Sequence, residues 1–235
     1  MARSYCLAGV TAEGEIYRVV RPLLAKFRDS PLANIGWSAY LLDGHSRWEV
    51  FKLVAPERAA HPPPHVEDLW VRGMSPRRTV ATAEQRRAIL TATKPQTGDA
   101  LFGASLLTTT GAAYIPAGAG CRSLTTLWAP ADQVVFHASR RGQHEPPEFR
   151  VRLGVAGLGD RLLSVKDHML LSRAEQAGPD IDGQLRAIRQ IVGQMGDPVV
   201  VRLGLSRPFL EGKHTEAGRC WVMADGFFSL SDPQS

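Results

Sequence analysis

The sequence predicts a mostly β fold built from two small barrel-like units in one chain. Extended segments are short and alternate between apolar and polar residues, Gly and Pro turns separate them, and helical patterns are few. The chain has 235 residues, including 22 Gly and 16 Pro. This length suits either one large domain or two domains of roughly 100–120 residues each.

In the first half, the predicted strands share this alternation and end at turn formers. Arg21-Pro22, for example, ends the second strand, because proline cannot continue a central strand. One helix is predicted over residues 82–90, with Thr82 as its N-cap. The predicted strands of this half cover residues 5–11, 15–20, 38–43, 47–54, 124–128 and 133–138.

A linker is predicted at residues 143–147, where two prolines follow polar residues. It divides the chain into domains 1–147 and 148–235. Residues 181–195 form the clearest helical pattern, with one apolar face. Five strands and one helix are the content of an OB-type barrel, so the sequence predicts two fused OB-like five-stranded barrels, each with about one helix. The strands predicted in the second half cover 149–155, 161–165, 199–205, 220–224 and 226–230.

The composition fits a cytoplasmic protein, and its modest positive charge is compatible with many functions. The net charge is +5, and only five of the 28 cationic residues are lysines. Arginine binds phosphate through two parallel hydrogen bonds and is better suited to it than lysine. An arginine-rich composition also follows, however, from a GC-rich genome. No segment approaches the ~20 apolar residues that cross a bilayer, so no membrane contact is expected. The three cysteines show no C-x-x-C spacing, which argues against a zinc ribbon or a disulfide framework.

No motif for catalysis or for a cofactor is found. The glycine pairs at residues 118–120 and 157–159 lack the third glycine of a dinucleotide loop, and neither a phosphate-binding loop nor a nucleophile elbow occurs. His61 and His65 are separated by three prolines, which is not the spacing of a metal-binding helix. We therefore expect neither an enzyme, nor a metal site, nor a bound cofactor.

Four segments carry a resemblance to a known family, in the order of that family and over nearly the whole chain. Residues 200–209 with 220–228 are similar to a closing pattern RLGLTRP…W…NGI. Residues 6–18 resemble CIAG…G.WIRPV, residues 65–68 resemble QPEN, and residues 163–167 resemble L.VTDP. These are patterns of the bacterial dual OB domain family. The resemblance implies two fused OB-like barrels and a role beside nucleic-acid-processing or conflict systems rather than catalysis.

Arginine and tryptophan side chains are the candidate contacts for nucleic acid. Arginines at strand ends can bind phosphate or a base, or instead pair with a carboxylate and fix the strand end. Basic residues on a strand can follow a nucleic-acid backbone or protect a solvated edge. Tryptophans can stack bases or fill the core, and core packing is expected for Trp221. The candidate contacts are Arg18, Arg21, Trp37, Trp70, Arg202 and Arg207.

The sequence thus predicts a non-catalytic module that binds nucleic acid, most simply a single strand, or a nucleotide. The alternative is a scaffold that docks a partner enzyme encoded nearby or senses a small nucleotide-like ligand. Binding that weakens with salt would support the first hypothesis, and co-purification with a partner would support the second.

Overall fold

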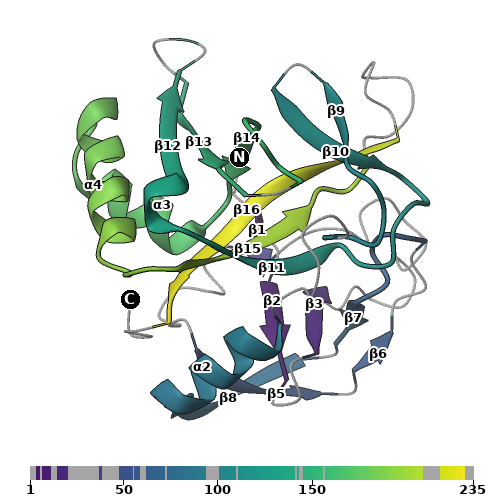
Figure 1. Cartoon of the computed structure of the whole chain (residues 1–235). Coiled ribbons are helices and arrows are strands. Elements are labelled where there is room, and N and C mark those ends of the chain that lie inside the picture. The colour runs from purple at the N-terminus through teal and green to yellow at the C-terminus, as the bar shows by residue number, and fades with distance from the viewer. Residues whose placement is uncertain are drawn as a thin grey trace.

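The computed structural model of the chain describes residues 4–5, 7–11, 15–20, 37–38, 48–54, 56–58, 62–71, 73–93, 101–109, 111–140, 142, 145–155, 157–208 and 218–230. Within these residues the fold is mostly β, as predicted, and its largest sheet curls into a half-barrel (Figure 1). None of the helices in this part of the chain has the length and apolar character needed to cross a membrane.

The largest sheet has eight strands, and six of them follow one another in the order β11-β15-β16-β14-β13-β12. Neighbouring strands are antiparallel except β14 and β16, which are parallel. The strands β10 and β9 extend the sheet from the first residues of β16. The strands are β9 (Leu107–Thr109), β10 (Ala112–Pro116), β11 (Leu124–Ala129), β12 (Val134–Ser139), β13 (Glu148–Leu153), β14 (Leu162–Val165), β15 (Val199–Leu205) and β16 (Arg219–Ser229).

The core lies on the inner side of this sheet, where β13 and β14 bury alternate residues and β15 is buried along its whole length. In β13, for example, Phe149, Val151 and Leu153 are buried while the residues between them are half-exposed. The helices α3 (His168–Gln176) and α4 (Ile181–Gly193) follow β14 and add their buried apolar faces to the same core. The short 3-10 helix η4 (Ala131–Gln133) separates β11 from β12. The chain therefore pairs with β15 along β11 and then with β13 along β12.

The first half of the chain adds smaller sheets, and Figure 1 shows β2, β3, β5, β6, β7 and β8 below β11. One sheet has the order β2-β3-β7-β6, and two further sheets pair β1 with β4 and β5 with β8. The strands are β1 (Ser4–Tyr5), β2 (Leu7–Val10), β3 (Ile16–Val20), β4 (Trp37–Ser38), β5 (Glu49–Val54), β6 (Glu57–Arg58), β7 (Asp68–Trp70) and β8 (Gly73–Val80).

Both predicted helices are present. The helix α2 (Ala83–Ala92) begins after Thr82, whose side chain accepts from the Gln85 N–H while the Gln85 side chain accepts from the Thr82 N–H. This reciprocal capping box is the signal that the sequence carried. The predicted helix 181–195 is α4. The helix α3 was not predicted, although Asp167 caps it in the way expected of an N-terminal aspartate.

The predicted linker at 143–147 lies in the connection between β12 and β13, which pair from Ser139 with Glu148 onward. The strands β11 and β12 precede residue 147 but belong to the same sheet as β13 to β16. The predicted domain boundary therefore falls inside one sheet. Proline and polar residues are equally common in hairpin loops and in linkers, so composition alone does not separate the two.

Candidate nucleic-acid interface

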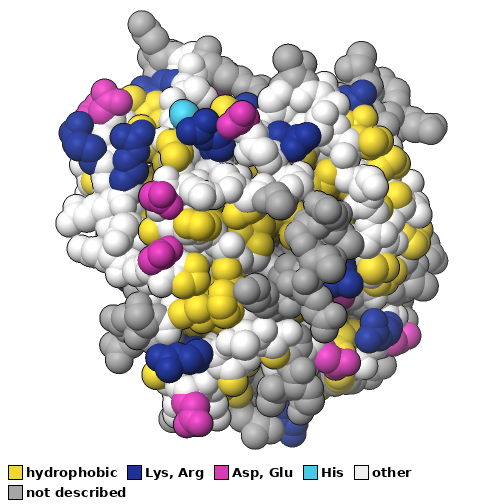
Figure 2. All heavy atoms as spheres, viewed as in Figure 1, with side chains coloured by type: hydrophobic (Ala, Val, Ile, Leu, Met, Phe, Trp, Pro, Cys, Tyr) yellow, Lys and Arg dark blue, Asp and Glu magenta, His cyan; other side chains and the backbone are white. Residues whose placement is uncertain are grey.

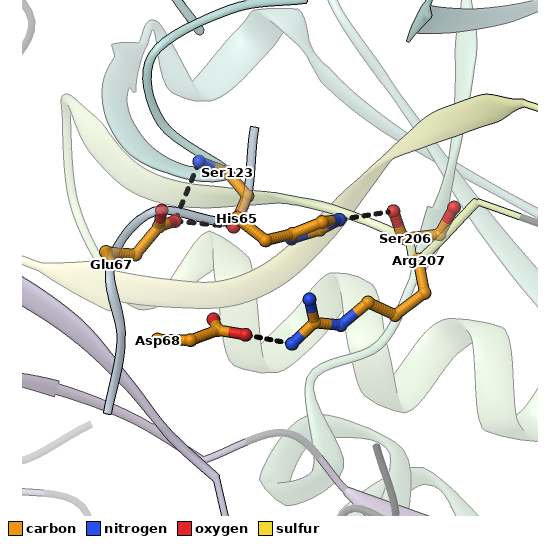
Figure 3. Close-up of polar contacts among 6 residues, drawn as sticks. All are labelled: His65, Glu67, Asp68, Ser123, Ser206 and Arg207. Carbon is orange, nitrogen blue, oxygen red and sulfur yellow. Dashed lines mark hydrogen bonds and ion pairs between the residues drawn. The ribbon is translucent and has the colours of Figure 1, made fainter. Parts of the chain in front are cut away.

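A buried polar network joins the segment 62–71 of the first half to the main sheet (Figure 3). Glu67 Oε1 accepts hydrogen bonds from the backbone N–H and the hydroxyl of Ser123, at 2.7 and 2.5 Å. His65 Nε2 lies 3.2 Å from the carbonyl oxygen of Ser206. His65, Glu67 and Ser123 are all buried. Because Ser123 precedes β11 and Ser206 follows β15, the network attaches this segment to one end of two paired strands.

Arg207, a predicted contact, belongs to this network. Its Nη2 donates to Oδ2 of Asp68, the first residue of β7. Asp68 is 0 % exposed, whereas about a quarter of the Arg207 side chain is exposed. The alternative role considered for this arginine, pairing with a carboxylate at a strand end, is therefore the contact that the structure contains.

Arg202, the other arginine of the C-terminal motif, is 7 % exposed and lies on the outer side of β15. Its guanidinium lies 5.7 Å from the Phe228 ring centroid, and the Trp48 ring packs at 5.4 Å on the same phenylalanine. A Cβ at Gly204 would overlap the Asp225 carboxylate, so the glycine makes room for that group. The residues of the motif thus form a packed junction between the two halves of the chain.

The environment of Arg202 disfavours its positive charge. Burial lowers the pKa of Arg202 to about 10, against the opposing attraction of Asp225. Its Nε is buried without a hydrogen-bond partner. Because the folded protein binds this proton less tightly than the unfolded chain does, the charge lowers the free energy of unfolding at every pH below about 10.

Replacing Arg202 with methionine should therefore leave the free energy of unfolding unchanged or raise it by about 1–3 kcal/mol, since an apolar chain of similar length fills the same space. Urea unfolding between about pH 6 and pH 9 should show a constant difference, because Arg202 stays charged throughout. Arg202→Ala, which leaves a cavity, should instead lower the free energy of unfolding by about 2–4 kcal/mol. A loss with methionine as large as the loss with alanine would contradict this account.

Three other predicted contacts, Arg18, Trp37 and Trp70, lie on strands of the small sheets of the first half. Arg18 lies on β3, in register with Ala8 of β2 and Asp68 of β7, and Trp70 is a half-buried residue of β7. Trp37 pairs with Tyr5 in the β1–β4 sheet. Arg21, and the side chains of Arg18 and Trp37, lie outside the described residues. The structure thus places Arg18 in register with Asp68 and pairs Arg207 with Asp68, and contact of these residues with nucleic acid stays a prediction.

A group of arginine side chains, with one histidine beside them, lies on the outer side of the main sheet. Arg150 and Arg152 alternate with buried residues of β13, and His137 of β12 is directly opposite Arg150. Together with the exposed Arg140 after β12, we call these four residues the basic face. Figure 2 shows Lys and Arg side chains gathered over the upper end of the molecule, where Figure 1 places α4, β12 and β13.

The basic face contains a hollow of about 310 Å³, lined in part by His137, Arg140 and Arg150. Arg150 pairs with Glu148 at 3.3 Å and Arg152 with Asp160 at 3.2 Å. All four side chains are at least 39 % exposed. Ion pairs this exposed contribute only about 0–1 kcal/mol, so a phosphate can replace either carboxylate at small cost.

The sequence carried a signal for this face, namely two arginines spaced by two in a strand with apolar residues between them. The predicted contacts instead came from the first half of the chain and from the motif at residues 200–209. Within the described part of the chain, no three His, Cys, Asp or Glu side chains gather as metal ligands. Comparisons with known protein families, with curated proteins and with solved structures found no match.

Proposed function

We propose that the protein is a non-catalytic module that binds nucleic acid through the basic face. The observation that carries the proposal is the set of exposed cationic side chains around the hollow on β12 and β13. Phosphate contacts of this kind supply most of the affinity in non-specific binding of nucleic acid. The net charge of +5 favours the approach of a polyanion.

We further propose that residues 124–230 form an OB-type barrel, as the resemblance to the dual OB domain family implies. Its first strand would be β11 and β12 together, followed by β13, β14, β15 and β16. The parallel pair β14–β16 and the helices between β14 and β15 support this assignment. OB-type barrels bind oligonucleotides on strands 2 and 3 and on the loops between strands 1 and 2 and between strands 4 and 5. The basic face occupies the corresponding strand and the first of these loops.

The test is a fluorescence anisotropy titration with labelled DNA and RNA single strands of about 12 nucleotides, a length within the site size of such barrels. We expect binding that weakens steeply between about 50 and 200 mM salt, because phosphate contacts release counterions. The double variant Arg150→Glu/Arg152→Glu should weaken binding by about 10- to 100-fold, since two contacts become repulsive.

The control Lys52→Glu/Arg87→Glu carries the same change of charge on exposed residues of β5 and α2. These elements lie at the opposite end of the molecule from β12 and β13 (Figure 1). This control should stay within about threefold of the parent, because charges beyond a Debye length of roughly 8–10 Å are screened. Equal losses in both variants would contradict a localised site. If no nucleic acid binds, the alternative of a partner-docking or nucleotide-sensing subunit takes its place, and a nucleotide panel then tests that alternative.

A further inference from the structure

Two aromatic rings and an arginine form a compact stack on the outer side of the strand pair β10–β16. Tyr114 and Trp221 are directly opposite each other, with ring centroids 5.2 Å apart and planes inclined by 55°. The Arg219 guanidinium lies over both rings, 4.9 Å from the centroid of Tyr114 and 5.8 Å from that of Trp221. We call Tyr114, Arg219 and Trp221 the aromatic platform.

The platform lies outside the hydrophobic core. Cys220 and Val222, on either side of Trp221, are buried in the core, as are Ala113 and Ile115 on either side of Tyr114. Trp221 and Tyr114 therefore point away from it, and both remain half-exposed. The expectation that Trp221 packs in the core is not met. The sequence context of apolar neighbours led to that expectation, whereas the alternation of the strand decides the side.

Hydrogen bonds to Ser206 fix the backbone of Trp221 without any ligand. The backbone N–H of Trp221 donates to Ser206 Oγ at 2.9 Å, and the backbone N–H of Ser206 donates to the Trp221 carbonyl oxygen at 2.9 Å. The Ser206 carbonyl oxygen accepts a hydrogen bond from Nε2 of buried His65 at 3.2 Å, in the tautomer that carries hydrogen on Nε2. The ring itself packs against Tyr114 and Arg219, and a ring already packed in this way loses little conformational freedom when a ligand stacks on it.

The platform continues the basic face along the same outer surface. Across neighbouring strands His137 is in register with Arg150, Arg150 with Ser164, and Ser164 with Met223. Trp221 lies two residues before Met223 and therefore on the same side of β16. Strand spacing and rise place the platform roughly 12 Å from Arg150 along the sheet. One short oligonucleotide can therefore contact both.

From this juxtaposition we infer that the platform binds an unpaired nucleobase of a single strand whose phosphates contact the basic face. The inference rests on the proposed function and specifies its ligand. A base can stack on the rings or on the outer side of the Arg219 guanidinium, which is itself planar. A base inside a duplex has both faces covered by its neighbours, so the platform selects unpaired strands.

The experiment compares three probes on the unmodified protein: an oligo-dT of about 12 nucleotides, an abasic strand with the same number of phosphates, and a duplex of the same length. We expect the oligo-dT to bind best, and the abasic strand and the duplex each to bind roughly 5- to 150-fold more weakly, the range given by one stacked base. Tryptophan fluorescence should be quenched by the oligo-dT and not by the abasic strand.

Variants of Trp221 test whether the preference for oligo-dT over the abasic strand arises at the aromatic platform. Trp221→Leu keeps an apolar side chain but removes the stacking surface, and it should bind oligo-dT roughly 5- to 150-fold more weakly while its affinity for the abasic strand is unchanged. Trp221→Phe keeps a ring and should remain within about threefold of the parent. Equal affinities for oligo-dT and the abasic strand would overturn the inference even if both variants failed to fold.

The two proposals fail in different ways. Binding that depends on Arg150 and Arg152 but not on bases or on Trp221 would overturn the platform and retain the basic face. Absence of binding to every probe would overturn both.

Discussion

Replacing Arg207 with alanine is expected to lower the free energy of unfolding by about 3 kcal/mol, measured by urea denaturation. The variant removes the cation that pairs with Asp68, a carboxylate with no exposed surface. Removing the partner of a buried charge is among the most costly changes that a single substitution can make. The contact also joins the first half of the chain to the residues after β15. Both halves should therefore unfold at a lower temperature in this variant.

Two further variants separate the lost charge pair from lost packing. Adding Asp68→Asn to Arg207→Ala should recover at least about half of the loss, because the charge that was left buried is gone. Arg186→Ala removes the partner of Asp180 in an ion pair with side chains 71 % and 63 % exposed, and it should cost less than about 1 kcal/mol. A double variant less stable than Arg207→Ala alone would show that charge burial is not the cause.

Asp167→Ala should lower the free energy of unfolding by about 2–4 kcal/mol. Asp167 is buried, and its two oxygens serve different elements: Oδ1 accepts from the Leu170 N–H at the start of α3, and Oδ2 from the Phe227 N–H of β16, both at 3.0 Å. The loss combines a missing helix cap of about 1 kcal/mol with a buried strand N–H left without an acceptor, about 1–3 kcal/mol. Chemical denaturation measures the sum.

Asp180→Ala is the matched control, because Asp180 caps α4 through the N–H groups of Asp182 and Gly183 but is largely exposed. It should cost only about 1 kcal/mol. Asp167→Asn should fall between the two, since its amide offers one oxygen for two N–H donors. Equal losses for Asp167→Ala and Asp180→Ala would contradict the double role.

Local patterns in the sequence predicted local structure well. The alternation of Phe149-Arg150-Val151-Arg152-Leu153 matches β13, and Thr82 with Gln85 matches the start of α2. The helix α3 was not predicted, although Asp167 has the character of an N-cap. Capping signals this short compete with the same residue in a turn.

Pairings between distant segments could not be predicted in this way. The strand β11 pairs with β15, about seventy residues further along the chain, and nothing within either segment specifies its partner. The same limit applies to the candidate sites. Arg202 and Arg207 belong to the same short motif. Arg202 is buried in the junction between the two halves, whereas Arg207 pairs with Asp68 of β7.

The pairing of β11 and β12 with strands from the far end of the chain has a practical consequence for anyone dividing this protein into pieces. A recombinant fragment that starts at residue 148 would lack β12, which pairs with β13, and β11, which pairs with β15. Each of the two strands would then expose one edge of unpaired backbone amides and carbonyls, to which other chains can hydrogen-bond. A shortened version suited to crystallisation or spectroscopy must therefore start upstream of Leu124.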